Sequence, residues 1–386
     1  MKFTPRLLAV VCATLAATSV SANDNDKLKV MTRNLYLGAD IFPVIEVANT
    51  QPALVPMAVS AAFQQMQQTN FRARVQAIAD EIHRYKPHAI GLQEVSSVYT
   101  QHPSDFGYSQ AGYPEHAADT LYVDYLSELL SALESRGLNY RVAVTSTNAD
   151  IELPMVVGGT PEAPQLDDLR LVDHDVILVR ADVQESNPLA NNFTYNVSMQ
   201  IAGTTLAFTR GYTAVDIDVK GEQYRLVNTH LETGGSEPFM SLQAVQMNEL
   251  LSVMQMTNPG SFPTVLMGDF NSAPTEQPFV SASGIPGLDG LPLYPPYLQA
   301  VGTGYQDLWI VQGKHKPGFT CCFNADVNDP DAQLSERIDH LFVNPQSREL
   351  HKVKVKVVGD DAVDMTMNGL WPSDHAGVVG KINFAE

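Results

Sequence analysis

Cysteine is scarce in this sequence: the 386 residues include only three, Cys12, Cys321 and Cys322. Their spacing matches no zinc or iron–sulfur site, and so small a number excludes a compact scaffold held together by several disulfides. A hydrophobic core must stabilise the chain instead, and 44% hydrophobic with 17% charged residues is typical of a globular protein. Two interpretations stay open for the adjacent pair, Cys321 and Cys322: a vicinal disulfide in an oxidising compartment, or two buried thiols.

Basic residues are also few. The chain has 24 Lys and Arg against 43 Asp and Glu, which gives a formal net charge of −19. A surface with this charge repels polyanions except where metal ions or a local basic patch intervene. The composition therefore argues against tight, non-specific binding to duplex nucleic acid. It does not exclude catalysis on phosphodiesters, because acidic residues hold the divalent cations that such chemistry uses.

The amino terminus carries an apolar run that is short for a membrane span. Lys2 and Arg6 precede the apolar residues 7–20, and the Val-Ser-Ala sequence at 20–22 fits a cleavage site. We predict that residues 1–22 are a secretory signal peptide and that the protein is secreted or periplasmic. An uncleaved membrane anchor is the alternative. After cleavage, 22 basic residues face 43 acidic ones, and the formal charge becomes −21.

The rest of the chain shows no repeat, low-complexity block or linker, so we predict a single domain over residues 23–386. Hydrophobic periodicity predicts helices at 71–85, 121–135 and 239–256, and strands at 27–35, 88–95, 174–181, 204–232 (several), 264–270, 337–343 and 352–358. Strands often follow one another without a helix between them. This favours antiparallel or mixed sheets with helices outside, over a doubly wound parallel sheet.

Apolar strands in this sequence repeatedly end in polar side chains suited to metals and phosphates. The six places are Asn34, Glu94, Asn228 with His230, Asp269 with Asn271, Asp339 with His340, and Asp374 with His375. Each alone fits a turn, a solvated acid or a structural histidine. Six in sequence order indicate a common site instead. By strand alternation His340 faces away from Asp339, so we expect it to be structural.

These stretches resemble the endonuclease/exonuclease/phosphatase superfamily, which includes deoxyribonucleases, abasic-site endonucleases, neutral sphingomyelinases and inositol-polyphosphate phosphatases. The matching segments are TRNLYLGAD, GLQEV, NTHLE, GDFNSAP, RIDHLFV and SDHAGV, in the order of the family and across almost the whole mature chain. The resemblance implies an α+β fold of four layers, α/β/β/α. Two mixed β-sheets pack face to face, helices cover the outside, and the site lies at one edge.

The resemblance also implies a metal-dependent phosphohydrolase of the deoxyribonuclease or sphingomyelinase kind. Glu94, Asn34 and Asp374 are the expected ligands of Mg²⁺ or Mn²⁺, which prefer hard oxygen donors. Asp269 is the expected general base that activates water. Asn271 is expected to orient the phosphate.

Histidines and further phosphate contacts complete the expected site. His375 contacts the phosphate, and Asp339 fixes the tautomer and orientation of its ring. His230 is a second phosphate-side histidine that can protonate a leaving alkoxide. Phosphate contacts are also expected from Asn228 and from Arg210, whose guanidinium suits bidentate binding, with an ordinary salt-bridged strand residue as the alternative for Arg210.

The sequence thus predicts a secreted phosphoesterase that hydrolyses phosphodiester bonds, most similar to a nuclease and acting as a monomer without a stable protein partner. A phospholipase C or sphingomyelinase activity and an inositol-phosphate phosphatase are alternatives, and a non-catalytic binding scaffold is the remaining one. The substrate is then a nucleic acid or a phospholipid headgroup. Residues 284–302 are expected to form a packed loop, with an apolar hairpin for membrane entry as the alternative.

Overall fold

The computed structural model describes residues 27–105, 117–201, 204–258, 262–313 and 316–385. The predicted signal peptide, residues 1–22, lies outside this part of the chain, so it stays a prediction. Among the described helices none is both long and apolar enough to cross a bilayer.

Two large mixed sheets form the centre of the molecule. The first orders its strands as β17 (Leu350–Val358), β18 (Gly377–Phe384), β1 (Leu28–Asn34), β2 (Ala89–Gln93), β6 (Ala163–Arg180), β3 (Ser97–Gln101) and β4 (Thr120–Asp124), and β5 (Tyr140–Thr160) also pairs with β6. The second runs β15 (Gln306–Asp307), β16 (Asp339–Asn344), β12 (Thr264–Asp269), β11 (Glu222–His230), β10 (Gly211–Val219) and β7 (Gln184–Asn192). Each sheet contains one parallel pair, β1 with β2 and β11 with β12, so both are mixed as predicted.

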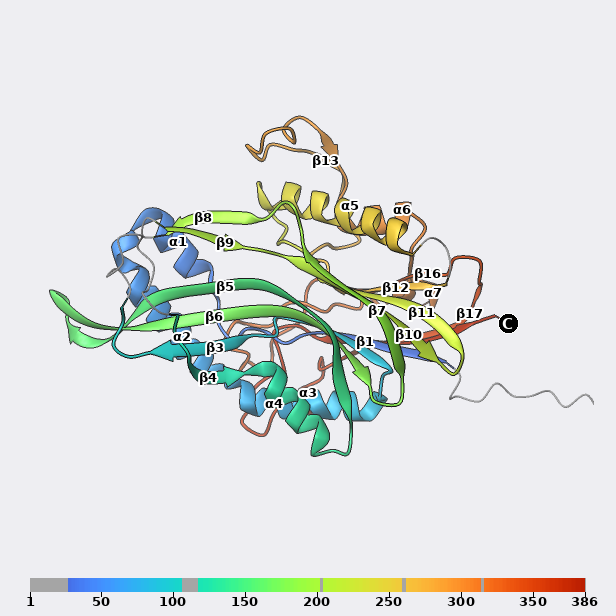
Figure 1. Cartoon of the computed structure of the whole chain (residues 1–386), viewed down its shortest axis with the longest axis horizontal. Coiled ribbons are helices and arrows are strands. Elements are labelled where there is room, and N and C mark those ends of the chain that lie inside the picture. The colour runs from blue at the N-terminus through green and yellow to red at the C-terminus, as the bar shows by residue number, and fades with distance from the viewer. Residues whose placement is uncertain (1–26, 106–116, 202–203, 259–261, 314–315, 386) are drawn as a thin grey trace, which may run out of the picture.

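Helices cover the outer face of each sheet, which confirms the predicted four-layer sandwich (Figure 1). The first sheet packs against α1 (Phe42–Thr50), α2 (Val55–Thr69), α3 (Phe71–Tyr85) and α4 (Tyr125–Glu134). The second packs against α5 (Phe239–Thr257) and α6 (Pro296–Gly302), and a short α7 (Leu308–Val311) lies beside β16 and β17. Single turns of 3₁₀ helix occur at η2 (Pro52–Leu54) and η3 (Ala362–Asp364).

The core between the sheets follows from strand alternation. Val30, Ile177, Val215, Leu226 and Val265 belong to one buried cluster that joins the two inner faces. Their neighbours in the chain point the other way, toward the helices, because successive side chains of a strand alternate between faces. Burying both faces of both sheets is what these nearly continuous apolar strands require.

Some predicted elements differ from the observed ones. The helix predicted at 121–135 begins only at Tyr125, because Thr120–Asp124 pairs as β4, and Asp124 then caps the helix by accepting from Ser127 N. Helices α1 and α2 were not predicted. Two small hairpins, β8 (Val197–Ile201) with β9 (Thr204–Phe208) and β13 (Phe279–Val280) with β14 (Pro292–Leu293), stand apart from the main sheets.

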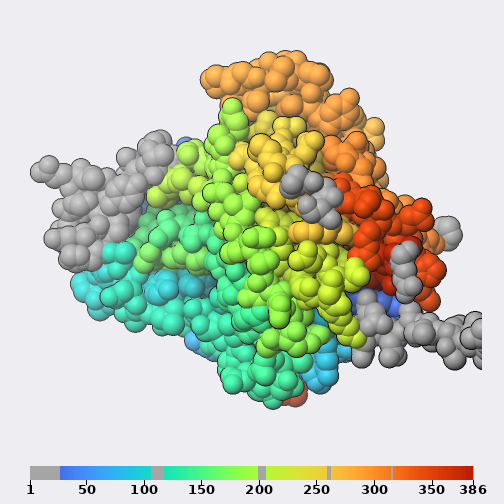
Figure 2. Space-filling model, turned by 45° about the vertical axis from the view of Figure 1, so that its right-hand side comes forward, coloured from blue at the N-terminus to red at the C-terminus, as the bar shows by residue number. Residues whose placement is uncertain are grey.

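The segment predicted as a packed loop, 284–302, is only partly packed. Tyr297 and Ala300 of α6 are buried in the cluster beneath α5. Leu291 and Tyr294 beside β14 are exposed, and the hairpin stands out from the body in orange above α5 (Figures 1 and 2). The packed residues belong to helix α6, and the exposed ones flank strand β14 of the hairpin.

Protonation of a buried histidine gives the fold a testable pH dependence. His88 Nδ1 accepts from Lys29 N over 3.1 Å, and burial, together with Arg180, lowers the pKa of His88 to about 4. The unfolded chain, with a histidine pKa near 6.5, therefore binds this proton more readily than the folded one. Stability is lost as pH falls from about 6.5 to about 4.

The change His88→Asn keeps an acceptor for Lys29 N and removes the titration. Between pH 7 and pH 4.5 we expect the wild type to lose about 2 kcal/mol more unfolding free energy than the variant does, as measured in guanidinium titrations. Equal losses in the two proteins would show that His88 is not held neutral.

Candidate active site

Polar side chains from both sheets meet at one end of the sandwich. Asn34 and Glu94 come from the ends of β1 and β2, which run parallel, and His230 and Asp269 end β11 and β12, which also run parallel. Asp339 begins β16, which runs antiparallel to β12 and pairs Asp339 with Asp269. The sheet register therefore places these side chains at one edge.

The backbone turns sharply as it leaves these strands. Glu94 (φ 55°), Asn271 (φ 49°) and Tyr36 (φ 59°) adopt the left-handed conformation, which non-glycine residues rarely take. Gly268 has φ 153°, and a Cβ built there would lie 2.1 Å from Thr229 O, so only glycine fits beside Asp269. Such backbone outliers cluster at functional sites because surrounding contacts must hold them.

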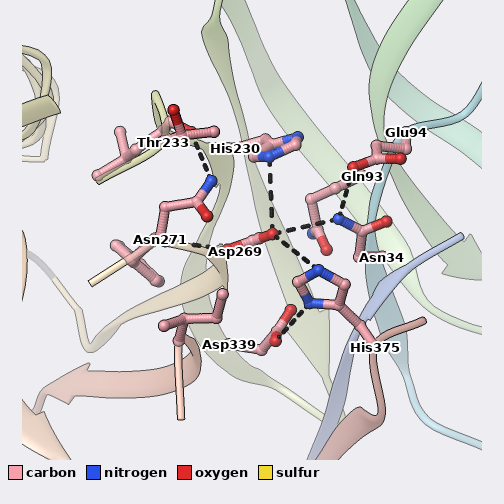
Figure 3. A network of polar contacts seen from close by, with 12 residues as sticks. Asn34, Gln93, Glu94, His230, Thr233, Asp269, Asn271, Asp339 and His375 are labelled. Carbon is pink, nitrogen blue, oxygen red and sulfur yellow. Dashed lines mark hydrogen bonds and ion pairs between the residues drawn. The ribbon is translucent and has the colours of Figure 1, made fainter. Parts of the chain in front are cut away.

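Asp269 is the centre of the site (Figure 3). Its Oδ1 accepts from Asn271 N over 2.9 Å, and its Oδ2 accepts from Asn34 Nδ2 over 3.1 Å. His230 Nε2 and His375 Nε2 lie 3.6 and 3.7 Å from the same Oδ2. Burial, with the charge of Asp339 adding to it, raises the pKa of Asp269 to about 7. A carboxyl with this pKa can exchange a proton near neutral pH.

His375 is held as an imidazolium. Its Nδ1 lies 2.9 Å from Asp339 Oδ2. Burial alone would lower the pKa of His375, but the charges of Asp339, Asp269 and Asp374 raise it well above its ordinary value. The predicted arrangement, in which Asp339 fixes the ring by its Nδ1, is present in the structure.

His230 has the opposite character. Burial, and then the charge of Arg210, lower its pKa well below the ordinary value, so the ring is neutral at neutral pH. Arg210 Nη1 lies 3.0 Å from His230 Nδ1. The same Nη1 lies 3.3 Å from His230 Nε2, so Nδ1 is the nearer acceptor for a guanidinium that can only donate, and this favours a ring proton on Nε2, the nitrogen that lies 3.6 Å from Asp269 Oδ2. The predicted role of His230 as a proton source for the leaving group stays a prediction.

Glu94 and Asp374, the two predicted carboxylate ligands of a metal, both line the cleft at this end of the sandwich. Burial, and then the charge of Asp374, raise the pKa of Glu94, whose Oε2 accepts from Leu37 N over 2.7 Å. In the described part of the chain no cationic side chain forms an ion pair with either carboxylate. The charge of His375 acts on both carboxylates from beyond ion-pair distance, and their hard oxygen donors fit Mg²⁺ or Mn²⁺.

Asn34 contacts both Glu94 and Asp269. Its Nδ2 donates to Glu94 Oε1 over 3.0 Å as well as to Asp269. Its Oδ1 accepts from Tyr36 N over 2.9 Å, which fixes the orientation of the amide. The amide oxygen keeps a second lone pair, so the contact of Asn34 with a metal stays a prediction, and its amide nitrogen links Glu94 to Asp269.

The sequence of this chain matches a known family model. The model described as the endonuclease/exonuclease/phosphatase family matches residues 62–375, more than half of the chain. The chain belongs to the endonuclease/exonuclease/phosphatase family. Members of this family are phosphoester hydrolases. A comparison with curated protein sequences found no match.

Solved structures of the family share the fold. A mannosyl-6-phosphatase of Bacteroides thetaiotaomicron VPI-5482 is 16% identical, with 93% of this chain and 100% of that chain covered and a TM-score of 0.53. Another family protein from Bacteroides thetaiotaomicron is 15% identical over 93% and 98% of the two chains, with a TM-score of 0.52. One from Leptotrichia buccalis C-1013-b is 18% identical over 92% and 100%, with a TM-score of 0.49. At these identities the likeness concerns the fold alone, and it rests on the two Bacteroides structures, whose TM-scores exceed 0.5.

Within this family fold, Asn228 lies apart from the other predicted site residues. It is fully buried between the sheets, where its Nδ2 donates to Leu92 O over 3.0 Å and its Oδ1 accepts from Gln93 Nε2 over 2.5 Å. It does not line the cleft described below. The prediction that Asn228 binds the substrate phosphate is corrected: it bridges the two sheets behind the site. His340, expected to be structural, is buried with its Nε2 on Ser272 O.

Two buried arginines that the sequence analysis missed hold the loops of the site. Arg74 of α3 donates to Leu35 O (2.7 Å), Tyr36 O (3.0 Å) and Pro372 O (2.9 Å). Arg33 of β1 donates to His375 O and pairs with Glu81 of α3 at 3.0 Å. The available signal was the position of Arg74 and Glu81 on the apolar face of an otherwise amphipathic helix.

The site opens into a cleft of about 650 Å³. Glu94, Asp269, Asn271, Asp374, Arg210 and both histidines line it. Its lining also includes the apolar side chains of Phe42, Ile151, Leu171, Phe208 and Phe323. The cleft thus combines charged groups with an apolar wall formed by these side chains.

The corrected role of Asn228 is testable against that of Asn271, which does line the cleft. Asn228→Ala leaves Gln93 Nε2 without its acceptor, and we expect it to lower unfolding free energy by about 1–3 kcal/mol with KM unchanged. Asn271→Ala is the matched change and should alter kinetics more than stability. Urea unfolding and steady-state kinetics check both. A large rise in KM for Asn228→Ala at unchanged stability would restore the predicted phosphate contact.

Proposed function

We propose that this protein is an exported, divalent-metal-dependent phosphodiesterase. The observation that carries the proposal is the environment of Asp269, whose Oδ2 faces Asn34, neutral His230 and charged His375 while its Oδ1 is held by a backbone N–H. A single carboxylate fixed at both oxygens, with a pKa near neutrality, suits a base that activates water. Export rests on the predicted signal peptide alone.

The side chains around Asp269 divide the remaining work. Asp269 accepts a proton from the attacking water. His375, kept charged and oriented by Asp339, donates from Nε2 to the phosphoryl oxygens, where negative charge grows in the transition state. His230 donates from its neutral Nε2–H, because Arg210 holds its other nitrogen. This donor role replaces the proton transfer to the leaving group that the sequence suggested.

Glu94 and Asp374 are the residues that would hold Mg²⁺ or Mn²⁺. When bound, such a cation polarises the phosphoryl group and offsets charge on the leaving oxygen. Asn34 keeps Glu94 and Asp269 at a fixed separation by donating to both. The base and the metal-side carboxylate therefore form one connected unit.

The cleft favours a compact phosphodiester with an apolar portion, such as a phospholipid headgroup ester, over a polymeric nucleic acid. Its acidic lining includes Asp40, Asp173, Glu276 and Glu336, and among the described lining residues Arg210 is the one permanently charged cation. A polyanion would be repelled along such a surface. The apolar wall gives an acyl chain or another apolar group a place to bind. Nuclease activity remains the second candidate, supported by the sequence motifs.

The test is hydrolysis by the full exported chain of phosphatidylcholine, sphingomyelin, inositol phosphates, plasmid DNA and RNA. We expect activity to disappear in EDTA and to return with Mg²⁺ or Mn²⁺, with the lipid esters cleaved faster than nucleic acid. Glu94→Gln should raise the Mg²⁺ concentration for half-activation, whereas the exposed Glu349→Gln serves as a control. Full turnover in chelator contradicts metal dependence, and a preference for DNA contradicts the choice of substrate.

The coupling of Asp339 to His375 gives a second prediction. Asp269→Asn and His375→Ala should each lower kcat by about 10²–10⁴, because general-base and charge-stabilising groups act in the transition state. Asp339→Asn should cost less, since it changes the ring's orientation and charge without deleting it.

In the double variant Asp339→Asn/His375→Ala the losses should not multiply, because Asp339 acts through the histidine. Circular dichroism of each variant checks folding. If the double loses the full product of the single effects, Asp339 has an independent role.

A further inference from the structure

The two adjacent cysteines lie in the wall of the active site. Thr320 O accepts from Ala376 N over 2.7 Å, and Phe323 N donates to Asp374 O over 2.8 Å, so the segment 320–323 runs beside the loop that carries Asp374 and His375. Cys321 N and O also bond to Glu336 O and N. The pair is thus fixed between β16 and the catalytic loop. In this structure a disulfide joins Cys321 to Cys322.

The sulfur atoms face the working nitrogen of the catalytic histidine. Cys321 Sγ lies 3.6 Å from His375 Nε2, and both sulfurs and a His375 nitrogen lie within 4.8 Å of one another. Because Asp339 occupies Nδ1, Nε2 is the nitrogen that faces the sulfurs and the cleft. Cys321 is buried and Cys322 is exposed, so the cluster is reachable from solvent on one side.

We propose that, after reduction, Cys321, Cys322 and His375 form a binding site for a thiophilic divalent cation such as Zn²⁺ or Cd²⁺, and that filling this site inhibits the enzyme. Two sulfurs and one imidazole are the donors such ions prefer, and they differ from the oxygen donors at Glu94 and Asp374. Zn–S and Zn–N bonds of about 2.3 and 2.05 Å in a tetrahedron put S and N about 3.6 Å apart. The distance from Cys321 Sγ to His375 Nε2 has this value in the oxidised pair, and after reduction the two sulfurs must separate to about 3.8 Å to bind the same ion. Inhibition rests on the proposed function, but binding does not.

An added dithiol or phosphine is the reductant of the disulfide. It transfers two electrons to the disulfide, the S–S bond breaks, and each sulfur takes up one proton. Binding of the cation then releases one proton from each thiol and the proton on His375 Nε2. Asp269 or a water completes the four ligands. In this state Nε2 no longer donates to a phosphoryl oxygen, so turnover stops.

Oxidation of the pair therefore protects the catalytic histidine. The disulfide sulfurs are poor metal donors because the thiolate is the ligand form. In the oxidised enzyme, thiophilic ions compete for a lone imidazole nitrogen only. Mg²⁺, a hard cation, is indifferent to the state of the pair.

The test uses the full chain carrying Cys12→Ser, oxidised or reduced with a phosphine under argon and then freed of reductant. Cd²⁺ is the probe, followed by thiolate-to-cadmium absorption and by equilibrium dialysis. We expect the reduced chain to bind one Cd²⁺ and to show thiolate-to-cadmium absorption. We expect the oxidised chain to show no such absorption. Cys322→Ser and His375→Asn should each weaken binding by at least about tenfold. The exposed His351→Asn, on β17, is the matched control and should bind as the reduced parent does.

Each outcome supports or overturns a named part of the proposal. Equal Cd²⁺ affinity in Cys321→Ser/Cys322→Ser and in the reduced parent overturns the site, and equal affinity in His375→Asn removes the histidine from it. Binding without inhibition of Mg²⁺-supported hydrolysis overturns the regulatory part. Binding as expected in a chain that hydrolyses none of the phosphoesters tested leaves the metal site standing and places the failure in the proposed function.

Discussion

A change from apolar to polar side chains along the inner faces of the two sheets is the constraint on which the site depends. Strand positions that point into the sandwich recur every second residue. Toward one end of the molecule these positions change character in strand after strand: Val30 to Asn34 in β1, Ala89 to Gln93 in β2, Ile177 to Asp173 in β6, Leu226 to His230 in β11, Val265 to Asp269 in β12, and Val343 to Asp339 in β16. The same packing that builds the core therefore delivers the catalytic groups. A one-residue slip of any strand would turn its polar group toward a helix layer.

Burial and neighbouring charges set the protonation of the histidines at the site. Three carboxylates around His375 keep it positive, while Arg210 and desolvation keep His230 neutral, although both rings lie at similar distances from Asp269 Oδ2. Two histidines beside one carboxylate thus differ in protonation because of their other neighbours. In the proposed mechanism one ring therefore stabilises negative charge and the other acts as a neutral donor.

Two buried arginines that lie outside the site hold its loops in place. Arg74 bonds to three carbonyl oxygens of the segments that follow β1 and precede His375, and Arg33 joins His375 O to Glu81. Removing a partner from such a buried pair leaves an uncompensated charge, which is far more costly than losing a surface ion pair. The helix layer thereby fixes catalytic loops that a sandwich core alone would not reach. Segment 320–323 adds a tie between β16 and the same loop.

By itself the sequence determined the fold class, many of the central strands and the polar groups that end them. These properties are local: alternation and strand ends are visible in any stretch such as TVLMGDF, and the family motifs are contiguous. Tertiary structure decided how several of these groups act. Asn228 bridges the sheets because Gln93, 135 residues away, contacts it there, and Asn34 is oriented by the backbone N–H of Tyr36 while it donates to Glu94 and Asp269. The neutrality of His230 and the position of Cys321 against His375 also depend on burial and on partners from other strands. No local pattern encodes such contacts, since they exist only once the two sheets have packed.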